Sequence, residues 1–326
     1  MYHRGRIACA AFVLGFLGCR EGAQPDPYRV ATFEGQADSV SCLLAGDGSM
    51  VVVSDAAIGG VGGVYRFDPE SYALTQLAAT GAQFIALDDD FLVAGSVPGR
   101  FQAVPLFRVP LAGGELERVS GIDGVRSLAT DAGAYYWHQR GSDGGIYRFD
   151  PSDGMLDLMF ATDEVRGDLV VSNGWLYWAE RQRVSRMPTS GGAPETLLDH
   201  PSEPTELSRP IAVDDIYVYF GVDTLTNPRL VAVPLAGGQP LEVAAVTRPP
   251  TAVAARDGFV YWAEGEQNRN EPMGGRVTIS RRHRDQRPAE VLAERQNGVS
   301  SIVPEDGRVF WCDWLANSIS MTALGG

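Results

Sequence analysis

The chain has 326 residues and a formal net charge of −14, which results from 41 acidic and 27 basic residues, all of the latter arginine. This acidic balance excludes a protein that binds nucleic-acid backbones, because such proteins need a basic surface. With 44% apolar residues, the chain can form a large hydrophobic core.

The first 26 residues have the character of an export segment. Two arginines precede an apolar stretch of eleven residues, Ile7–Leu17, which is too short to cross a bilayer as a helix. Its end, Phe16-Leu17-Gly18-Cys19, resembles a bacterial lipobox, with Phe16 where Leu is usual. The resemblance implies a signal peptide over residues 1–18, then a lipidated Cys19 and a polar tether over residues 19–26. The alternative is cleavage nearby and release of a soluble protein.

Residues 27–326 repeat one unit about every 42 residues. Its clearest mark is an aromatic pair at the end of a short apolar run, and two weaker copies precede the aromatic ones. The second residues of successive pairs are spaced 42, 43, 41, 42, 42 and 49 apart. A period of this size is typical of a repeat architecture. The pairs are Val51-Val52, Val93-Ala94, Tyr136-Trp137, Tyr177-Trp178, Tyr219-Phe220, Tyr261-Trp262 and Phe310-Trp311.

One copy shows what the unit contains. Residues 208–244 hold four short runs rich in Val, Ile, Tyr and Phe, separated by Asp, Gly and Pro clusters. Such runs predict strands and such clusters predict turns. The Gly237-Gly238 pair suits a hairpin turn that needs positive φ. Four strands in about 42 residues is the size of a propeller blade, so we expect the aromatic pairs to pack between neighbouring blades.

The seventh copy ends at Gly325-Gly326 without a fourth strand. The segment Pro27–Phe33 is similar to the sequence that follows Gly237-Gly238, so it predicts the outer strand of the last blade. Pairing the two chain ends removes the open edges of a linear array. The sequence therefore predicts an all-β fold over residues 27–326, a monomeric seven-bladed β-propeller of four-stranded antiparallel blades closed by its N-terminal strand.

The aromatic pairs resemble the YWTD and NHL propeller repeats, in which Ile-Ala-x-Asp precedes Val-Tyr-Trp-x-Asp. This chain keeps the last aspartate of that pattern once, at Asp313. The turns that read Val-Pro-Leu-Ala-Gly-Gly are similar to those of secreted bacterial propellers. The resemblance covers nearly all of the chain after the export segment and implies a fold, not a function.

Two cysteines fall in neighbouring blades of the predicted ring. Cys42 lies in the first strand of blade one, and Cys312 directly follows Trp311 in blade seven. The repeat alignment places both at a similar height. An exported protein meets an oxidising compartment, so a Cys42–Cys312 disulfide is one interpretation. Two buried free thiols are the other.

Catalytic and metal-binding motifs are missing from the sequence. It contains no G-x-S-x-G, no H-E-x-x-H and no Walker lysine motif. The three histidines that follow the export segment, His138, His200 and His283, lie in different copies, and we expect His138, which follows Trp137, to be a surface residue. The sequence predicts no metal site and no cofactor.

Position alone gives the candidate site. Propellers generally bind ligands where the loops between blades meet the loops between second and third strands. Arginines with nearby carboxylates on that face could receive an anionic small molecule or a peptide end. Ion pairs that order the channel mouth are the alternative. The longest loop, Glu264–Gly275, lies on the same face and explains the 49-residue interval. The candidate residues are Arg126, Arg166, Arg209, Glu180, Glu264 and Asp313.

These observations favour a non-enzymatic module of the bacterial cell envelope that binds a protein, peptide or glycan through its loop face. It would touch the membrane only through a lipid anchor, or be a soluble periplasmic or secreted protein. A propeller-type lyase or lactonase with a divalent metal in the channel is the rival hypothesis. The matching channel positions lack the ligand cluster that such a metal needs.

Overall fold

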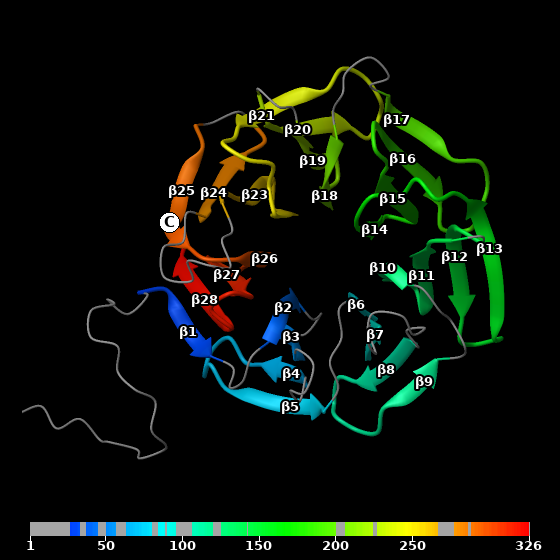
Figure 1. The fold of residues 1–326 in the computed structure, drawn as a ribbon, viewed down its shortest axis with the longest axis horizontal. Coiled ribbons are helices and arrows are strands. Elements are labelled where there is room, and N and C mark those ends of the chain that lie inside the picture. The colour runs from blue at the N-terminus through cyan, green and yellow to red at the C-terminus, as the bar shows by residue number, and fades with distance from the viewer. Residues whose placement is uncertain are drawn as a thin grey trace, which may run out of the picture.

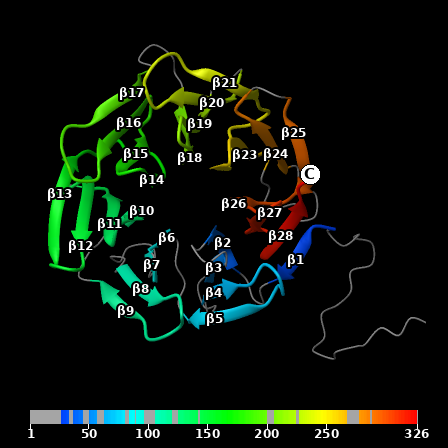
Figure 2. The same ribbon diagram turned by 180° about the vertical axis from the view of Figure 1, so that it is seen from behind.

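The computed structural model is a ring of seven four-stranded sheets, each antiparallel (Figure 1). The view from behind shows the same closed ring (Figure 2). The predicted all-β, seven-bladed propeller is confirmed. The structure describes residues 27–32, 37–44, 50–56, 63–79, 84–88, 90–95, 106–119, 125–141, 143–199, 206–223, 227–266, 277–285 and 288–325, without the side chains of 37–44, 53–56, 84, 206–209 and 295.

The blades follow one another along the chain. Within each blade the strands are arranged in chain order from the inside of the ring to the outside, except that β1 is the outermost strand of blade seven. Blades one to three are β2 (Ala37–Leu44), β3 (Met50–Ala56), β4 (Gly63–Phe67) and β5 (Leu74–Ala78); β6 (Phe84–Leu87), β7 (Phe91–Gly95), β8 (Leu106–Pro110) and β9 (Glu117–Val119); and β10 (Val125–Asp131), β11 (Ala134–Gln139), β12 (Gly145–Asp150) and β13 (Met155–Ala161). Blades four to six are β14 (Leu169–Ser172), β15 (Trp175–Ala179), β16 (Arg183–Pro188) and β17 (Glu195–Asp199); β18 (Glu206–Val213), β19 (Tyr217–Asp223), β20 (Arg229–Pro234) and β21 (Leu241–Ala245); and β22 (Ala252–Arg256), β23 (Phe259–Glu264), β24 (Val277–His283) and β25 (Glu290–Gln296). Blade seven is β26 (Val299–Glu305), β27 (Arg308–Asp313), β28 (Ser318–Ala323) and β1 (Arg29–Thr32).

Blade seven combines the first strand of the ring with its last three strands. Strand β1 pairs antiparallel with β28, and the two lie side by side in both ribbon views. The N–H of Met321 donates to the carbonyl of Tyr28 at 2.8 Å. The ring of Tyr28 packs against Trp311 with centroids 5.6 Å apart. The predicted closure by the N-terminal strand is therefore confirmed, whereas the expected signal peptide and tether lie outside the described residues.

The aromatic pairs fill the spaces between blades, because neighbouring residues of a strand point to opposite faces of the sheet. In blade four, Tyr177 packs with residues of blade five such as Phe220, whereas Trp178 packs with Tyr136 of blade three. A Tyr-Trp pair thus serves both interfaces of its blade. Burying one indole contributes about 4–6 kcal/mol of hydrophobic free energy, so the repeated tryptophan explains much of the core.

The strand ends lie on two opposite sides of the ring, which we call the upper and the lower end. At the upper end lie the connections between blades and the loops from second to third strands. At the lower end lie the turns that join first to second and third to fourth strands. Gly237 and Gly238 form one lower turn with φ of 79° and 125°, which confirms the predicted need for glycine.

Candidate functional site

The predicted site residues do not form one group. Arg126 lies at the upper end of β10, Arg166 in the connection that precedes β14, and Glu180 just after β15, so these three belong to the neighbouring blades three and four. Glu264 ends β23 and Asp313 ends β27, two and three blades further round the ring. Arg209 lies on β18, and its side chain is outside the described residues.

Two of the predicted carboxylates bind the indoles that precede them. The Nε1–H of Trp178 donates to Oε1 of Glu180 at 3.0 Å, and that of Trp262 donates to Oε1 of Glu264 at 3.2 Å. Residues two apart on a strand share a face, which explains the spacing. The other oxygen of Glu264 accepts hydrogen bonds from the N–H and hydroxyl of Thr247, at 2.7 and 3.2 Å. These glutamates satisfy buried donors that would otherwise cost stability.

Asp313 organises the last upper loop. Its Oδ1 accepts hydrogen bonds from the N–H groups of Gly298, Leu315 and Ala316 at 3.0, 3.1 and 2.9 Å. Its Oδ2 accepts the N–H of Asn297 at 3.0 Å, and the side chain is 1% exposed. For Trp311 of this blade, Gln296 takes over the role of the glutamate. Gln296 ends β25 of blade six, and its Oε1 accepts the indole N–H of Trp311 at 3.1 Å. The carboxylate of Asp313 is thus engaged within the fold.

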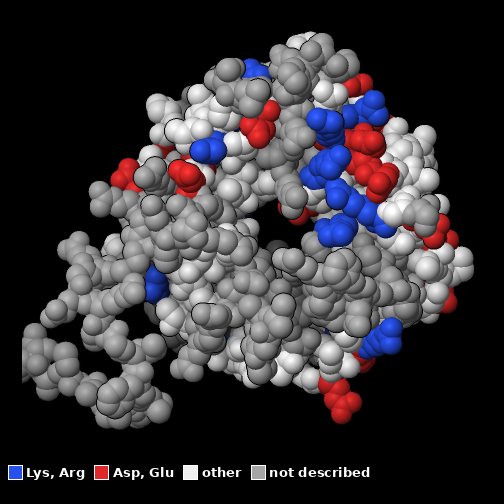
Figure 3. Space-filling model, viewed as in Figure 1, with Lys and Arg blue, Asp and Glu red and all other residues white. Residues whose placement is uncertain are grey.

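Unlike these carboxylates, which donors of the fold engage, three arginines at the upper end of blades three and four have no oppositely charged partner among the described residues. Arg126, Arg140 and Arg166 are exposed, and none forms an ion pair with a carboxylate of the described residues. Arg140 reaches from blade three to the carbonyl of Val165, next to Arg166, at 3.4 Å. Figure 3 shows basic side chains gathered beside the central opening over these blades. We call Arg126, Arg140 and Arg166 the upper arginine cluster.

A neighbouring arginine is excluded from that cluster because it is paired. Arg183, at the start of β16, lies 3.6 Å from Glu180 and 3.4 Å from Asp199. The predicted alternative, ion pairs that order the channel mouth, therefore describes Arg183, whereas Arg126 and Arg166 have no such partner among the described carboxylates.

His138 lies beside the upper arginine cluster and is buried, so the prediction of a surface residue is wrong. Only 1% of it is exposed, because both faces of a blade are covered by neighbouring blades. Its Nε2 has no hydrogen-bond partner in the described part of the chain. Ser127 faces it across the β10–β11 pair, and its buried hydroxyl also lacks a described partner.

The surroundings of His138 favour the neutral imidazole. Desolvation, followed by the positive charge of Arg140, lowers its pKa from 6.5 to about 4. Asp163 and a backbone hydrogen bond at Thr162 oppose this shift, and Arg126 adds to it. Near neutral pH, the buried imidazole is therefore uncharged, and the positive charge at the upper end of blade three belongs to the exposed guanidiniums of Arg126 and Arg140. These guanidiniums suit an incoming group that carries negative charge.

The sequence prediction missed Arg140. The signal was its place three residues after Trp137, directly after the strand that carries the aromatic pair. What the sequence could not show is the distance to blade four, which depends on how neighbouring blades are stacked. The loop Glu264–Gly275, predicted to lie on this face, falls mostly outside the described residues.

Cys312 is fully buried and is disulfide-bonded. Strand β2, which carries Cys42, contacts β26 and β27 of blade seven. This places the two strands as the predicted disulfide requires. The side chain of Cys42 is outside the described residues, so its pairing with Cys312 stays a prediction.

Among the described residues, no group of three His, Cys, Asp or Glu side chains is arranged to hold a metal ion. The same residues include no helix with the length and apolar character needed to cross a membrane.

No protein-family model matches this chain, and no curated protein is similar to it in sequence. Its fold is similar to that of bacterial β-propeller proteins. The extracellular domain of the putative hybrid two-component system BT4673 from B. thetaiotaomicron has a TM-score of 0.66 and 14% identity, over 90% of this chain but only 39% of that one. Oligogalacturonate lyase from Vibrio parahaemolyticus has a TM-score of 0.64 and 11% identity, over 92% of this chain and 94% of the lyase. BamB from Moraxella catarrhalis has a TM-score of 0.52 and 14% identity, over 87% and 83%. At these identities the likeness shows the fold alone.

Proposed function

We propose that this chain is an exported binding module that holds a protein, peptide or glycan partner against its upper face. The upper arginine cluster receives an anionic group of that partner. The module is attached to a membrane of the bacterial cell envelope through lipidated Cys19, so that residues 20–26 act as a short tether.

The proposal rests on one difference at the upper face: the arginines of the cluster have no described carboxylate partner, whereas the predicted carboxylates are engaged by donors of the fold. The protein is strongly acidic, with a net charge of −14, yet three exposed arginines stand together there without a described carboxylate partner. The predicted carboxylates of the same face are engaged by indole, hydroxyl and backbone donors. Guanidinium groups bind carboxylates and phosphates in a bidentate way, and such charge-assisted hydrogen bonds are among the strong ones.

The test is a binding screen of the intact soluble protein against acidic peptides and acidic glycans. The variant R126Q/R140Q/R166Q should bind any ligand found at least about tenfold more weakly, since each lost charged hydrogen bond is worth about 1.5–3 kcal/mol. The control variant R29Q/R118Q/R248Q removes the same charge from exposed arginines outside the cluster and should keep the affinity. Equal weakening by both variants would show a general charge effect and refute a site at the cluster.

The anchor has its own test. Metabolic labelling with an alkyne fatty acid should mark the full chain, and Cys19→Ser should abolish the label and release the protein from membranes. A protein that stays unlabelled and soluble with Cys19 intact would be secreted instead. This result would remove the anchor and leave the binding proposal standing.

A further inference from the structure

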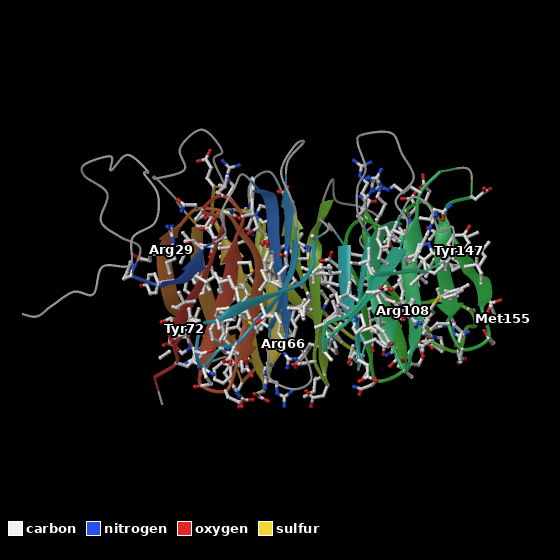
Figure 4. The ribbon with its side chains drawn as sticks, turned by 90° about the horizontal axis from the view of Figure 1, so that it is seen from below. Arg29, Arg66, Tyr72, Arg108, Tyr147 and Met155 are labelled. Atoms are coloured by element: carbon white, nitrogen blue, oxygen red, sulfur yellow. The ribbon has the colours of Figure 1, made fainter. Side chains whose placement is uncertain are left out.

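The third strands of five blades carry an arginine at the same register position. Each lies opposite the first residue of the repeated pair on the second strand. Figure 4 labels two of these arginines, Arg66 and Arg108, on neighbouring blades. The pairs are Arg66 with Val51, Arg108 with Val93, Arg148 with Tyr136, Arg186 with Tyr177, and Arg281 with Tyr261. Blade five has Ala232 opposite Tyr219 at this position.

In blades two, four and six this arginine makes the same two contacts, which we call the arginine clamp. Its guanidinium lies over an aromatic ring near the start of the second strand and pairs with a glutamate on the fourth strand. Arg186 lies 4.2 Å from the ring centroid of Trp175 and 2.9 Å from Glu195. The corresponding distances are 4.7 and 2.6 Å for Arg108 with Phe91 and Glu117, and 4.9 and 2.7 Å for Arg281 with Phe259 and Glu290.

Blade five keeps the aromatic ring of the clamp and lacks both charged residues. Tyr217 occupies the position of Trp175, whereas Ala232 replaces the arginine and Leu241 replaces the glutamate. An open pocket lies there, at the lower end between blades five and six. It is lined by Tyr217, Tyr219, Ala232, Leu241, Glu242, Val243, Val260, Arg282, His283 and Arg284.

The cationic residues of this pocket already have partners. Arg284 lies 3.7 Å from Asp214 and also pairs with Asp215. Arg282 donates to the carbonyl of Val243.

The carboxylates outweigh these cations. Glu242 lines the pocket, is exposed, and forms no ion pair within the described part of the chain. Glu242 is the carboxylate of the lining, whereas Asp214 and Asp215 pair with Arg284, and Asp285 lies 3.1 Å from Nδ1 of His283. The lining residues and these partners together contain four carboxylates and two guanidiniums. The local charge therefore favours a cationic ligand.

We propose that this blade-five pocket binds the guanidinium group of an arginine presented by another protein chain. The incoming group lies on the ring of Tyr217 and pairs with Glu242, and so replaces the arginine that the fold itself supplies in blades two, four and six. Aromatic rings attract cations placed over their faces, and a carboxylate at the rim adds a charge-assisted hydrogen bond. The pocket is at the opposite end of the strands from the upper arginine cluster, so this proposal does not depend on the proposed function.

The test is a titration of the intact soluble protein with N-acetylarginine amide, followed by NMR or calorimetry. One stacking contact and one ion pair predict a dissociation constant on the order of millimolar. N-acetylcitrulline amide has the same shape without the charge and should bind at least about tenfold more weakly. N-acetyllysine amide, which cannot stack as a plane, should fall between the two. Agmatine, which has the guanidinium without a peptide backbone, should bind no more tightly than the arginine amide.

Two designed variants locate the site. A232R/L241E rebuilds the clamp within blade five and should abolish binding while raising the melting temperature. R186A/E195L removes the clamp of blade four and should create a second, similar site. If A232R/L241E does not fold, Glu242→Gln replaces it and should weaken binding of the arginine amide by at least about threefold.

Three results would overturn the proposal. The first is no binding of the arginine amide up to about 50 mM, well above the affinity expected for two contacts. The second is equal affinity for the citrulline amide. The third is full binding by a folded A232R/L241E protein. Tighter binding of agmatine than of the arginine amide would refute the protein side chain as the natural source of the group.

Discussion

Two groups of arginines, one at the lower and one at the upper end of the strands, are used in different ways. At the lower end, Arg108, Arg186 and Arg281 each stack on an aromatic ring and pair with a glutamate. At the upper end, Arg126 and Arg166 have neither kind of partner among the described residues. The carboxylates show no such difference, because Glu180, Glu264 and Asp313 at the upper end are held by donors of the fold, as the clamp glutamates are at the lower end.

The clamp arginines stabilise the fold, whereas Arg126 and Arg166 have no described partner that would let them do so. An exposed arginine that stabilises nothing in its own chain is free to meet an external anion. By the same reasoning, Ala232 stands where other blades have an internal arginine, and we propose the pocket beside it as a place for an external cation. Substitutions of the engaged residues and of the upper arginine cluster should therefore change the free energy of unfolding by different amounts.

Asp313→Ala should have the largest effect. It removes the acceptor for four backbone N–H groups at a site that is 1% exposed. The free energy of unfolding should fall by about 3 kcal/mol or more, since each orphaned donor costs about 1–3 kcal/mol before water reaches it. Urea denaturation measures the loss. Asp313→Asn keeps the Oδ1 acceptor and should lose less, and a loss below about 1 kcal/mol in the alanine variant would contradict the role.

The pH dependence of stability should show the next largest effect. The pKa of His138 is about 4 in the folded protein against 6.5 ordinarily, so the unfolded chain takes up the proton first. The stability that this group contributes is complete above about pH 6.5 and is lost as the pH falls toward 4, by up to about 3 kcal/mol.

Urea denaturation at pH 7 and pH 4.5 measures this loss. His138→Gln cannot titrate, so it should show a smaller decrease between these two pH values than the unmodified protein. The same decrease in both proteins would show that other groups cause the acid sensitivity.

Removing one arginine clamp should have a smaller effect. Arg186→Ala loses the contact over Trp175 and the ion pair with Glu195. Because the side chain of Glu195 is half exposed, the expected loss is about 1–2 kcal/mol, mostly from the stacking contact. Thermal denaturation should show Glu195→Gln to be milder than Arg186→Ala. Equal losses would assign the stability to the ion pair instead.

The smallest effect is expected for the upper arginine cluster. R126Q/R140Q/R166Q should change the free energy of unfolding by no more than about 0.5 kcal/mol. Arg126 and Arg166 are exposed without a described carboxylate partner, and the hydrogen bond of Arg140 to the Val165 carbonyl is long, at 3.4 Å. A loss above about 1 kcal/mol would mean that these arginines belong to the fold, as the clamp arginines do.

The sequence predicted the architecture because the features that define it are local and repeated. The spacing of the Tyr-Trp pairs predicted the blades, and the similarity of Pro27–Phe33 to the sequence after Gly237-Gly238 predicted the split blade. The arginine clamp was not predicted, although Arg108–Glu117, Arg186–Glu195 and Arg281–Glu290 share a separation of nine residues that is a signal in the sequence. That separation follows from a tight hairpin between third and fourth strands.

The contacts between blades could not be predicted in the same way. The approach of Arg140 to Val165, and the burial of His138, depend on the stacking of one sheet on the next. The blade-five pocket arises from a missing side chain, Ala232, and a small residue in a repeat gives no local signal of the space beside it.

The closing strand imposes an order on folding. Strand β1 is the first strand of the ring in chain order and its partner β28 is the last, so their pairing cannot begin until the strands between them have been synthesised. Until then the edge of β1 is unpaired, and such an edge is open to proteases and to other strands. A chain that stops before Ser318 would lack the partner of β1, and its ring would stay open. The ring can therefore close only after all seven blades have been made.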